Sequence, residues 1–195
     1  MFVRYAGTLI FLLSLCLNCY ASDWLLNSYT FNTEAGCTTG QTIIGDAATT
    51  NNYGLSNNLI YFVRKTAAKS CNLATIVTHF SDAGSTTTFR SAIYADNGSG
   101  TAPTGDPLGY TAQCNTTAGD GNPEDADCAL GSAVSLTAST YYWMGTIANN
   151  TTGVYYGTTS ANGYMSWAYS PTDPFPTIAS FSAWNKDWSL SGESE

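Results

Sequence analysis

Short apolar stretches that are regularly interrupted by turn residues constrain the fold of this chain most strongly. After residue 21, β-branched and aromatic residues recur in runs of a few positions, and each run is bounded by Gly, Asn, Asp or Pro. No window of about a dozen residues keeps the helical period of about 3.6 residues. Turn residues instead return at a spacing of roughly ten residues, which is typical of antiparallel sandwiches and barrels. The pattern therefore predicts an all-β protein.

Alternation within the predicted strands indicates which side chains share a face. Over residues 58–65, the odd-numbered residues from Leu59 lie on one face and the even-numbered residues from Ile60 on the other. Trp143 and Trp188 are expected in the core, because large rings are hard to leave in water. We predict a two-sheet antiparallel β-sandwich with a jelly-roll-like arrangement. Its strands are expected over residues 25–31, 41–44, 58–65, 73–80, 88–95, 108–113, 133–136, 141–147, 154–158, 164–169 and 181–190.

The first 21 residues have the features of a secretory signal peptide. Arg4 supplies a positive charge, and the apolar run Leu9–Leu17 is too short to span a hydrocarbon core of about 30 Å as a helix. Small residues precede a predicted cleavage after Ala21. The alternatives are an uncleaved anchor helix and a lipoprotein leader that ends at Cys16 or Cys19. The leader predicts a secreted protein that is extracellular or lies at the cell surface.

The remaining sequence predicts one sandwich domain over residues 22–190 and a frayed tail over residues 191–195. Aromatic residues make up 13% of the chain, which supplies a core and argues against disorder. Charged residues make up only 10%, and the formal net charge is −8. A negative chain repels phosphate groups, so nucleic acid is excluded as a partner.

Four cysteines follow the predicted leader, and an even number in an exported protein implies two disulfides. Three connectivities are possible. We favour Cys37–Cys71 and Cys114–Cys128, because these pairs are nearest in sequence. A zinc site is not expected, because the spacing lacks a C-x2-C pair and the chain has one histidine.

The segment between Cys114 and Cys128 is rich in acidic and amide side chains. Oxygen ligands at alternating positions suit Ca²⁺, which takes six to eight of them. The segment does not end in the glutamate of an EF-hand loop, and the alternative is a solvated acidic loop held by a disulfide. The candidate ligands are Asp120, Asn122, Glu124, Asp125 and Asp127.

A longer pattern in the middle of the chain resembles a known module. The stretch from Arg90 to Pro103 reads R-S-A-I-Y-A-D-N-G-S-G-T-A-P, and residues 134–143 read V-S-L-T-A-S-T-Y-Y-W. With the later D-P-F-P over residues 173–176, this resembles a β-sandwich module common in secreted and surface proteins of bacteria. The resemblance covers about residues 42–191 and implies a carbohydrate-binding-like jelly roll. Ser139 stands where the pattern usually has Gly, and the insertion over residues 113–129 departs from it.

Aromatic side chains are the candidate ligand-binding groups. Sugar rings present apolar C–H faces on which Trp and Tyr can stack, while the alternative is that these rings fill the core. The candidate platforms are Tyr155, Tyr156, Trp167, Tyr169 and Trp184. Four sequons in predicted loops supply candidate glycosylation sites at Asn97, Asn115, Asn149 and Asn150.

The sequence carries few signals for catalysis, and a hydrolase that uses two of its acidic side chains is the remaining enzymatic alternative. The chain has no G-x-S-x-G, no H-E-x-x-H and no P-loop, and His79 is expected to pack within a strand. We therefore expect a non-catalytic sandwich that binds glycans or a cell-surface partner. The alternative is a structural subunit of an extracellular filament, sheath or surface layer, which would self-associate by strand addition at an exposed sheet edge.

Overall fold

The computed structural model describes residues 37–46, 51–57, 59–82, 87–116, 123–149, 152–157, 162–170, 172–184 and 187–195. Over these ranges the chain forms strands, turns and loops and no helix, which confirms the all-β prediction. The described part of the chain thus holds no helix that is long and apolar enough to cross a membrane. The predicted leader over 1–21 and the predicted strand over 25–31 lie outside the described residues.

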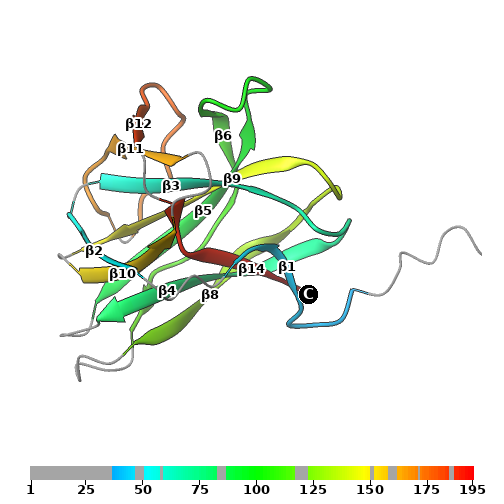
Figure 1. Ribbon diagram of the computed structural model, residues 1–195, viewed down its shortest axis with the longest axis horizontal. Helices are drawn as coiled ribbons and strands as arrows, with labels where there is room; N and C mark the ends of the chain where they lie inside the picture. Colours follow the sequence, from blue (N-terminus) through cyan, green and yellow to red (C-terminus); the bar gives the residue numbers. More distant parts are fainter. Residues whose placement is uncertain are drawn as a thin grey trace, which may run out of the picture. The chain divides into compact units, whose positions relative to one another are not determined.

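The described strands form two seven-stranded sheets in which every pairing is antiparallel (Figure 1). The predicted antiparallel sandwich is confirmed. Sheet A consists of β1 (Thr42–Gly45), β2 (Asn51–Leu55), β4 (Asn72–Asp82), β8 (Glu124–Ser135), β10 (Thr152–Gly157), β13 (Asp187–Trp188) and β14 (Leu190–Ser194). Sheet B consists of β3 (Leu59–Thr66), β5 (Thr88–Asp96), β6 (Pro103–Tyr110), β7 (Cys114–Asn115), β9 (Tyr141–Ala148), β11 (Asn162–Ser166) and β12 (Ser182–Trp184).

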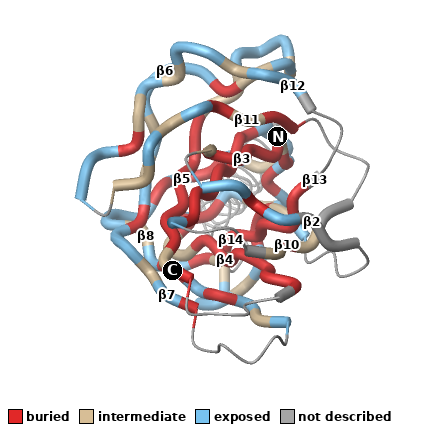
Figure 2. Tube along the Cα trace, turned by 90° about the vertical axis from the view of Figure 1, so that its left-hand side faces the viewer, coloured by how far each residue is buried: buried red, intermediate tan, exposed pale blue. Residues whose placement is uncertain are grey.

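The main hydrophobic core lies between the two sheets. Aromatic pairs join the layers: the rings of Tyr61 and Trp188 are 4.8 Å apart between centroids, and those of Phe80 and Phe89 are 5.2 Å apart. Trp188 is 2% exposed, as predicted for a core residue. Figure 2 shows that buried residues are concentrated in the inner strands, whereas β6 is largely exposed.

A second, smaller core covers the outer face of sheet B. The even-numbered residues of β3, Ile60 and Phe62, point into it, together with Tyr94 and the fully buried Trp143. A largely irregular segment, residues 167–170 and 172–181, closes this core; we call it the covering segment. Sheet B is therefore buried on both faces, which explains why its central strands carry apolar residues at successive positions.

The C-terminal residues correct the sequence prediction. The expected single strand over 181–190 is divided into β12, β13 and the start of β14. The expected frayed tail is wrong for residues 191–194, because β14 pairs with β4 on one side and β1 on the other. Gly192 permits this close fit, since a Cβ there would lie 2.4 Å from Cδ1 of Leu73.

Both favoured disulfides are present in the structure. Cys37 is linked to Cys71 with Cα atoms 6.1 Å apart, and Cys114 is linked to Cys128 with Cα atoms 5.8 Å apart. The first bond ties the segment before β1 to the start of β4, and the second joins β7 of sheet B to β8 of sheet A. Disulfides of this kind are typical of proteins in oxidising compartments.

Candidate functional site

A hollow of about 460 Å³ opens where β3, β9 and β5 come together at one end of sheet B. Its walls include Arg64 near the end of β3, Asp96 at the end of β5 and Tyr141 at the start of β9. The turn before β9 adds the exposed hydroxyls of Ser139 and Thr140. This combination of an aromatic ring, a cation and hydroxyls is suited to a small polar ligand with an apolar face.

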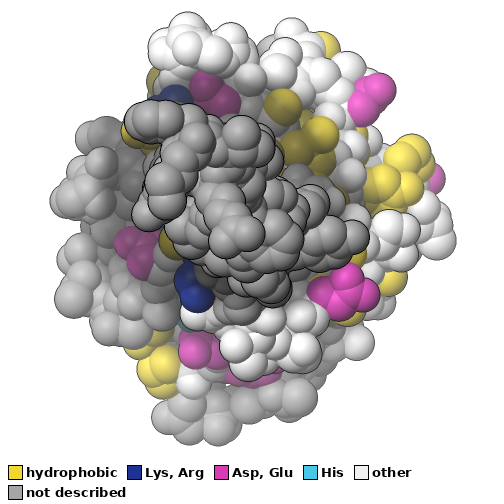
Figure 3. All heavy atoms as spheres, turned by 90° about the vertical axis from the view of Figure 1, so that its right-hand side faces the viewer, with side chains coloured by type: hydrophobic (Ala, Val, Ile, Leu, Met, Phe, Trp, Pro, Cys, Tyr) yellow, Lys and Arg dark blue, Asp and Glu magenta, His cyan; other side chains and the backbone are white. Residues whose placement is uncertain are grey.

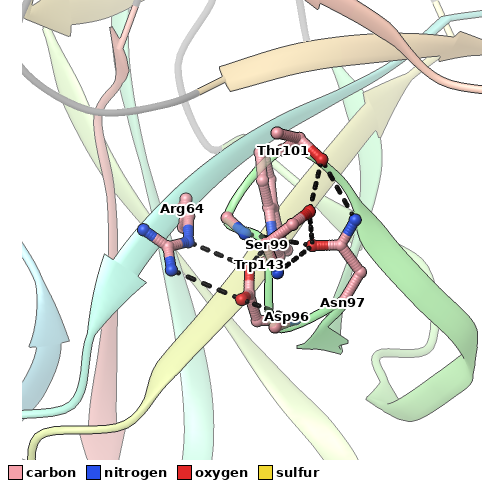
Figure 4. A network of polar contacts seen from close by, with 8 residues as sticks. Arg64, Asp96, Asn97, Ser99, Thr101 and Trp143 are labelled. Carbon is pink, nitrogen blue, oxygen red and sulfur yellow. Dashed lines mark hydrogen bonds and ion pairs between the residues drawn. The ribbon is translucent and has the colours of Figure 1, made fainter.

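Asp96, which lines this hollow, is the centre of a hydrogen-bond network (Figure 4). Its carboxylate accepts hydrogen bonds from Arg64 Nε at 2.9 Å, Trp143 Nε1 at 2.7 Å and the backbone N–H of Gly98 at 3.0 Å. Burial alone would raise the pKa of Asp96, but the hydrogen bonds from Arg64 and Trp143 and the charge of Arg64 outweigh it and lower that pKa. The carboxylate is therefore held in its charged form.

The substitution Asp96→Asn is expected to lower the free energy of unfolding by about 2 kcal/mol at neutral pH, because charged hydrogen bonds are lost. The pKa of Asp96 is lower in the folded protein than in the unfolded chain. Its contribution is thus present above the ordinary carboxyl pKa of about 3.9 and is lost as the pH falls through the lower, folded-state pKa. Urea unfolding between pH 7 and pH 2 should show the two proteins converging in acid.

Asp106→Asn is the matched control for that experiment. Asp106 accepts a hydrogen bond from the hydroxyl of Thr177. The side-chain oxygen of asparagine can accept the same hydrogen bond, so Asp106→Asn should change the free energy of unfolding little. A constant stability difference between wild type and Asp96→Asn across the whole pH range would contradict the charged role of Asp96.

The guanidinium of Arg64 lies over the ring of Tyr141, an exposed residue. The Cζ atom of Arg64 lies 3.5 Å from the ring centroid, and the residue Tyr141 is 46% exposed. Gly100 lies against the guanidinium, since a Cβ at this position would be 2.9 Å from Arg64 Cζ. Gly100 also has a φ of +74°, which favours glycine. Ser139 has a φ of 62°, in the left-handed region that glycine adopts most readily.

Two of the predicted aromatic platforms belong to the covering segment. Trp167 stacks on Phe175 with ring centroids 5.4 Å apart, and the hydroxyl of Tyr169 donates to Gln113 Oε1 at 3.3 Å. Both rings are half-buried and pack against the outer core of sheet B. Burial raises the pKa of Tyr169, and the nearby charge of Arg90 opposes that rise. The structure thus gives these two rings a packing role, and ligand binding by them stays a prediction.

The other predicted platforms are not gathered into one surface with Trp167 and Tyr169. Tyr155 is half-buried on β10 of sheet A, and Tyr156 follows it on the same strand. Trp184 ends β12 of sheet B. The side chains of Tyr156 and Trp184 lie outside the described part of the structure.

The acidic segment is partly a strand. Residues 124–128 belong to β8 and pair with β4, so Asp125 and Asp127 lie on the opposite face from Glu124. The expectation of a loop over these residues is wrong, because β4 supplies backbone partners for them. No group of three or more acidic, His or Cys side chains in the described ranges could hold a metal ion. Asp120 and Asn122 lie outside those ranges, so calcium binding stays a prediction.

His79 joins three strands of sheet A. Its Nδ1 lies 2.5 Å from Asp125 Oδ1 on β8, and its Nε2 lies 3.0 Å from Ser191 Oγ on β14. The order of groups is that of a Ser–His–Asp triad. However, His79 and Ser191 are 3% and 4% exposed, and the strands that carry them use their backbone groups for pairing rather than for an oxyanion hole. We interpret the array as an anchor for β14.

Three of the four sequon asparagines lie in the described residues, and all three are exposed. Asn97 forms a turn in which its Oδ1 accepts from Ser99 N at 3.1 Å and from Ser99 Oγ at 2.9 Å. Asn115 lies on β7, and Asn149 Oδ1 accepts a hydrogen bond from Thr88 N. Asn150 lies outside the described residues, and glycosylation stays a prediction.

Arg64, Asp96 and Tyr141 were not among the predicted ligand-binding residues. They are far apart in the sequence, and cross-strand register brings them together: β3 pairs Arg64 with Trp143, and β9 pairs Tyr142 with Ala95 of β5. The local sequence offered one sign of a site here: Arg64 and Tyr141 lie near strand ends and alternate with core residues.

No protein-family model matches this chain, and no curated protein matches it. The resemblance to bacterial sandwich modules therefore stays a prediction from the residues that carry it.

Proposed function

We propose that this protein is a secreted, non-catalytic β-sandwich that binds a glycan of a cell surface or matrix in the hollow formed by Arg64, Asp96 and Tyr141. The observation that carries the proposal is the exposed residue Tyr141, whose ring has the Arg64 guanidinium over one face and shares the hollow with two exposed hydroxyls. Secretion is supported by the predicted leader and by two disulfides, which suit an oxidising compartment.

Each group in the hollow has a role in this proposal. The face of the Tyr141 ring opposite Arg64 stacks on the C–H face of a sugar ring, and the N–H groups of Arg64 together with the hydroxyls of Ser139 and Thr140 bond to its oxygens. Because Asp96 and Gly100 hold Arg64 in place, little side-chain freedom is lost when the ligand binds. A rigid sheet end thus presents a preformed, shallow site.

Tyr141→Ala is expected to weaken glycan binding at least tenfold, which corresponds to about 1.4 kcal/mol. Binding to soluble polysaccharides can be measured by affinity electrophoresis and by calorimetry. Leu108→Ala is the matched control, because Leu108 is also 46% exposed and lies outside the hollow. A Tyr141→Ala protein that binds as tightly as wild type would refute the proposed site, and binding lost instead in Trp167→Ala would favour the covering segment.

The alternative, a filament subunit that grows by strand addition, has less support from the sheet edges at β6, β8 and β12. The edge strand β6 contains Pro103 and Pro107 and has an irregular register with β5, and β12 has three residues. The edge strand β8 carries Glu124, Asp125 and Asp127. Prolines, irregular register, short length and charge each discourage pairing with another chain. A monomer at high concentration in light scattering is the expected result.

A further inference from the structure

The charges around the hollow are compensated within the protein, and we infer that the glycan it binds is uncharged. This inference rests on the proposed function and deepens it by assigning the ligand class. It distinguishes neutral polysaccharides from those that carry carboxylate or sulfate groups.

The carboxylate of Asp96 already accepts as many hydrogen bonds as it can, so it cannot accept another from a ligand. Its two oxygens accept from Arg64 Nε at 2.9 Å, Arg64 Nη2 at 3.3 Å, Trp143 Nε1 at 2.7 Å and Gly98 N at 3.0 Å. The carboxylate balances the charge of Arg64, and the side chain of Asp96 is only 10% exposed. An anionic sugar that approached Arg64 would therefore compete with a bidentate ion pair already formed inside the protein.

The other cationic side chains in the described residues also bond to groups of the protein itself. Lys65 Nζ bonds to Asp46 at 2.8 Å, and Lys69 Nζ bonds to Gln41 at 3.0 Å. Arg90 is buried beneath the covering segment, where it bonds to backbone carbonyls. The whole chain has a formal net charge of −8, and acidic side chains are spread over the face drawn in Figure 3. Such a surface repels polyanions at distances up to a Debye length of about 8 Å.

The side chains of the hollow that can contact a ligand are neutral or are fixed hydrogen-bond donors. Tyr141 offers the ring face opposite Arg64, and Ser139 and Thr140 offer hydroxyls. Arg64 has five N–H donors, and in the described structure only those on Nε and Nη2 bond to Asp96. Its Nη1 group, fixed between Tyr141 and Gly100, is positioned to donate to a sugar hydroxyl. The arrangement fits hydroxyl-rich, uncharged sugar rings.

The test uses the full chain against two sets of soluble polysaccharides. One set is neutral (glucan, mannan, xylan and galactan), and the other is acidic (polygalacturonate, alginate and a sulfated galactan). Neutral ligands should bind with an affinity that changes less than twofold between about 20 mM and 500 mM NaCl. Acidic ligands should bind at least tenfold more weakly. Preferential binding of acidic ligands, reduced by salt, would overturn this inference alone, whereas binding of neither set would overturn the proposed function as well.

A pair of glycine variants tests the role of Arg64. Gly100→Ala places a methyl group against the guanidinium, whereas Gly105→Ala has the same left-handed backbone constraint, with a φ of +69°, and open space around it. Neutral-glycan affinity should fall at least fivefold in Gly100→Ala and stay unchanged in Gly105→Ala. Equal affinities in the two variants would show that the orientation of Arg64 does not select the ligand.

Discussion

Replacing Arg90 with methionine is expected to lower the free energy of unfolding by about 3–5 kcal/mol. Arg90 is 2% exposed and lies on the outer face of sheet B, under the covering segment. Its guanidinium donates to the carbonyl oxygens of Thr111 at 3.3 Å, Ser170 at 2.7 Å and Asp173 at 2.6 Å. Methionine fills a similar volume but leaves these three carbonyls without their donor, so the covering segment should detach from the sheet.

Urea unfolding monitored by tryptophan fluorescence measures this loss, because Trp167 in the covering segment and Trp143 beneath it both report on the outer core. Arg90→Lys should give an intermediate loss, since it keeps the charge but lacks the planar fork of donors. Lys69→Met is the control, because Lys69 is half-buried and makes one hydrogen bond to Gln41. If Arg90→Met unfolds at the wild-type urea concentration, the covering segment does not depend on Arg90.

Removing the Cys37–Cys71 disulfide is expected to lower the free energy of unfolding by about 4 kcal/mol. This bond closes a loop with a sequence separation of 34, whereas the Cys114–Cys128 bond has a separation of 14. In the chain-entropy model the longer loop stabilises more, and the shorter ring corresponds to about 3 kcal/mol. The protein with Cys37→Ser and Cys71→Ala should therefore be less stable than the variant that lacks only the Cys114–Cys128 bond.

Hydrogen exchange locates the effect of each bond. Without Cys37–Cys71, amides of β1 and of its partner β14 should exchange faster, because the bond ties the segment before β1 to β4. The double variant at Cys114 and Cys128 should instead expose β7. Equal stability of the two variants would contradict the dependence on loop length.

Local alternation made the central strands predictable. The two faces of residues 58–65 lie as predicted, with Tyr61 and Val63 in the core between the sheets and Ile60 and Phe62 in the outer core. Trp143 and Trp188 are buried as expected. These predictions hold because successive side chains of a strand point to opposite faces, whatever the strand's partner is.

The strand β14 could not be predicted from its own residues. Its sequence, Leu-Ser-Gly-Glu-Ser, has low strand propensity, and it is a strand because β1 and β4 hold it on both sides. The hydroxyl of Ser194 adds a hydrogen bond to Thr38 O at 2.6 Å. Backbone pairing of this kind depends little on residue type, so tertiary context overrides the local preference.

The sequence by itself determined that this chain is a disulfide-linked, all-β protein, because side-chain alternation, turn residues and cysteine spacing are local properties. Only the tertiary structure decided that sheet B is covered on both faces and that Arg64, Asp96 and Tyr141 share one hollow. The contacts that create the hollow join residues 32 and 47 positions apart, from Asp96 to Arg64 and to Trp143. Such contacts follow from strand order and register, which are set by the packing of the whole domain.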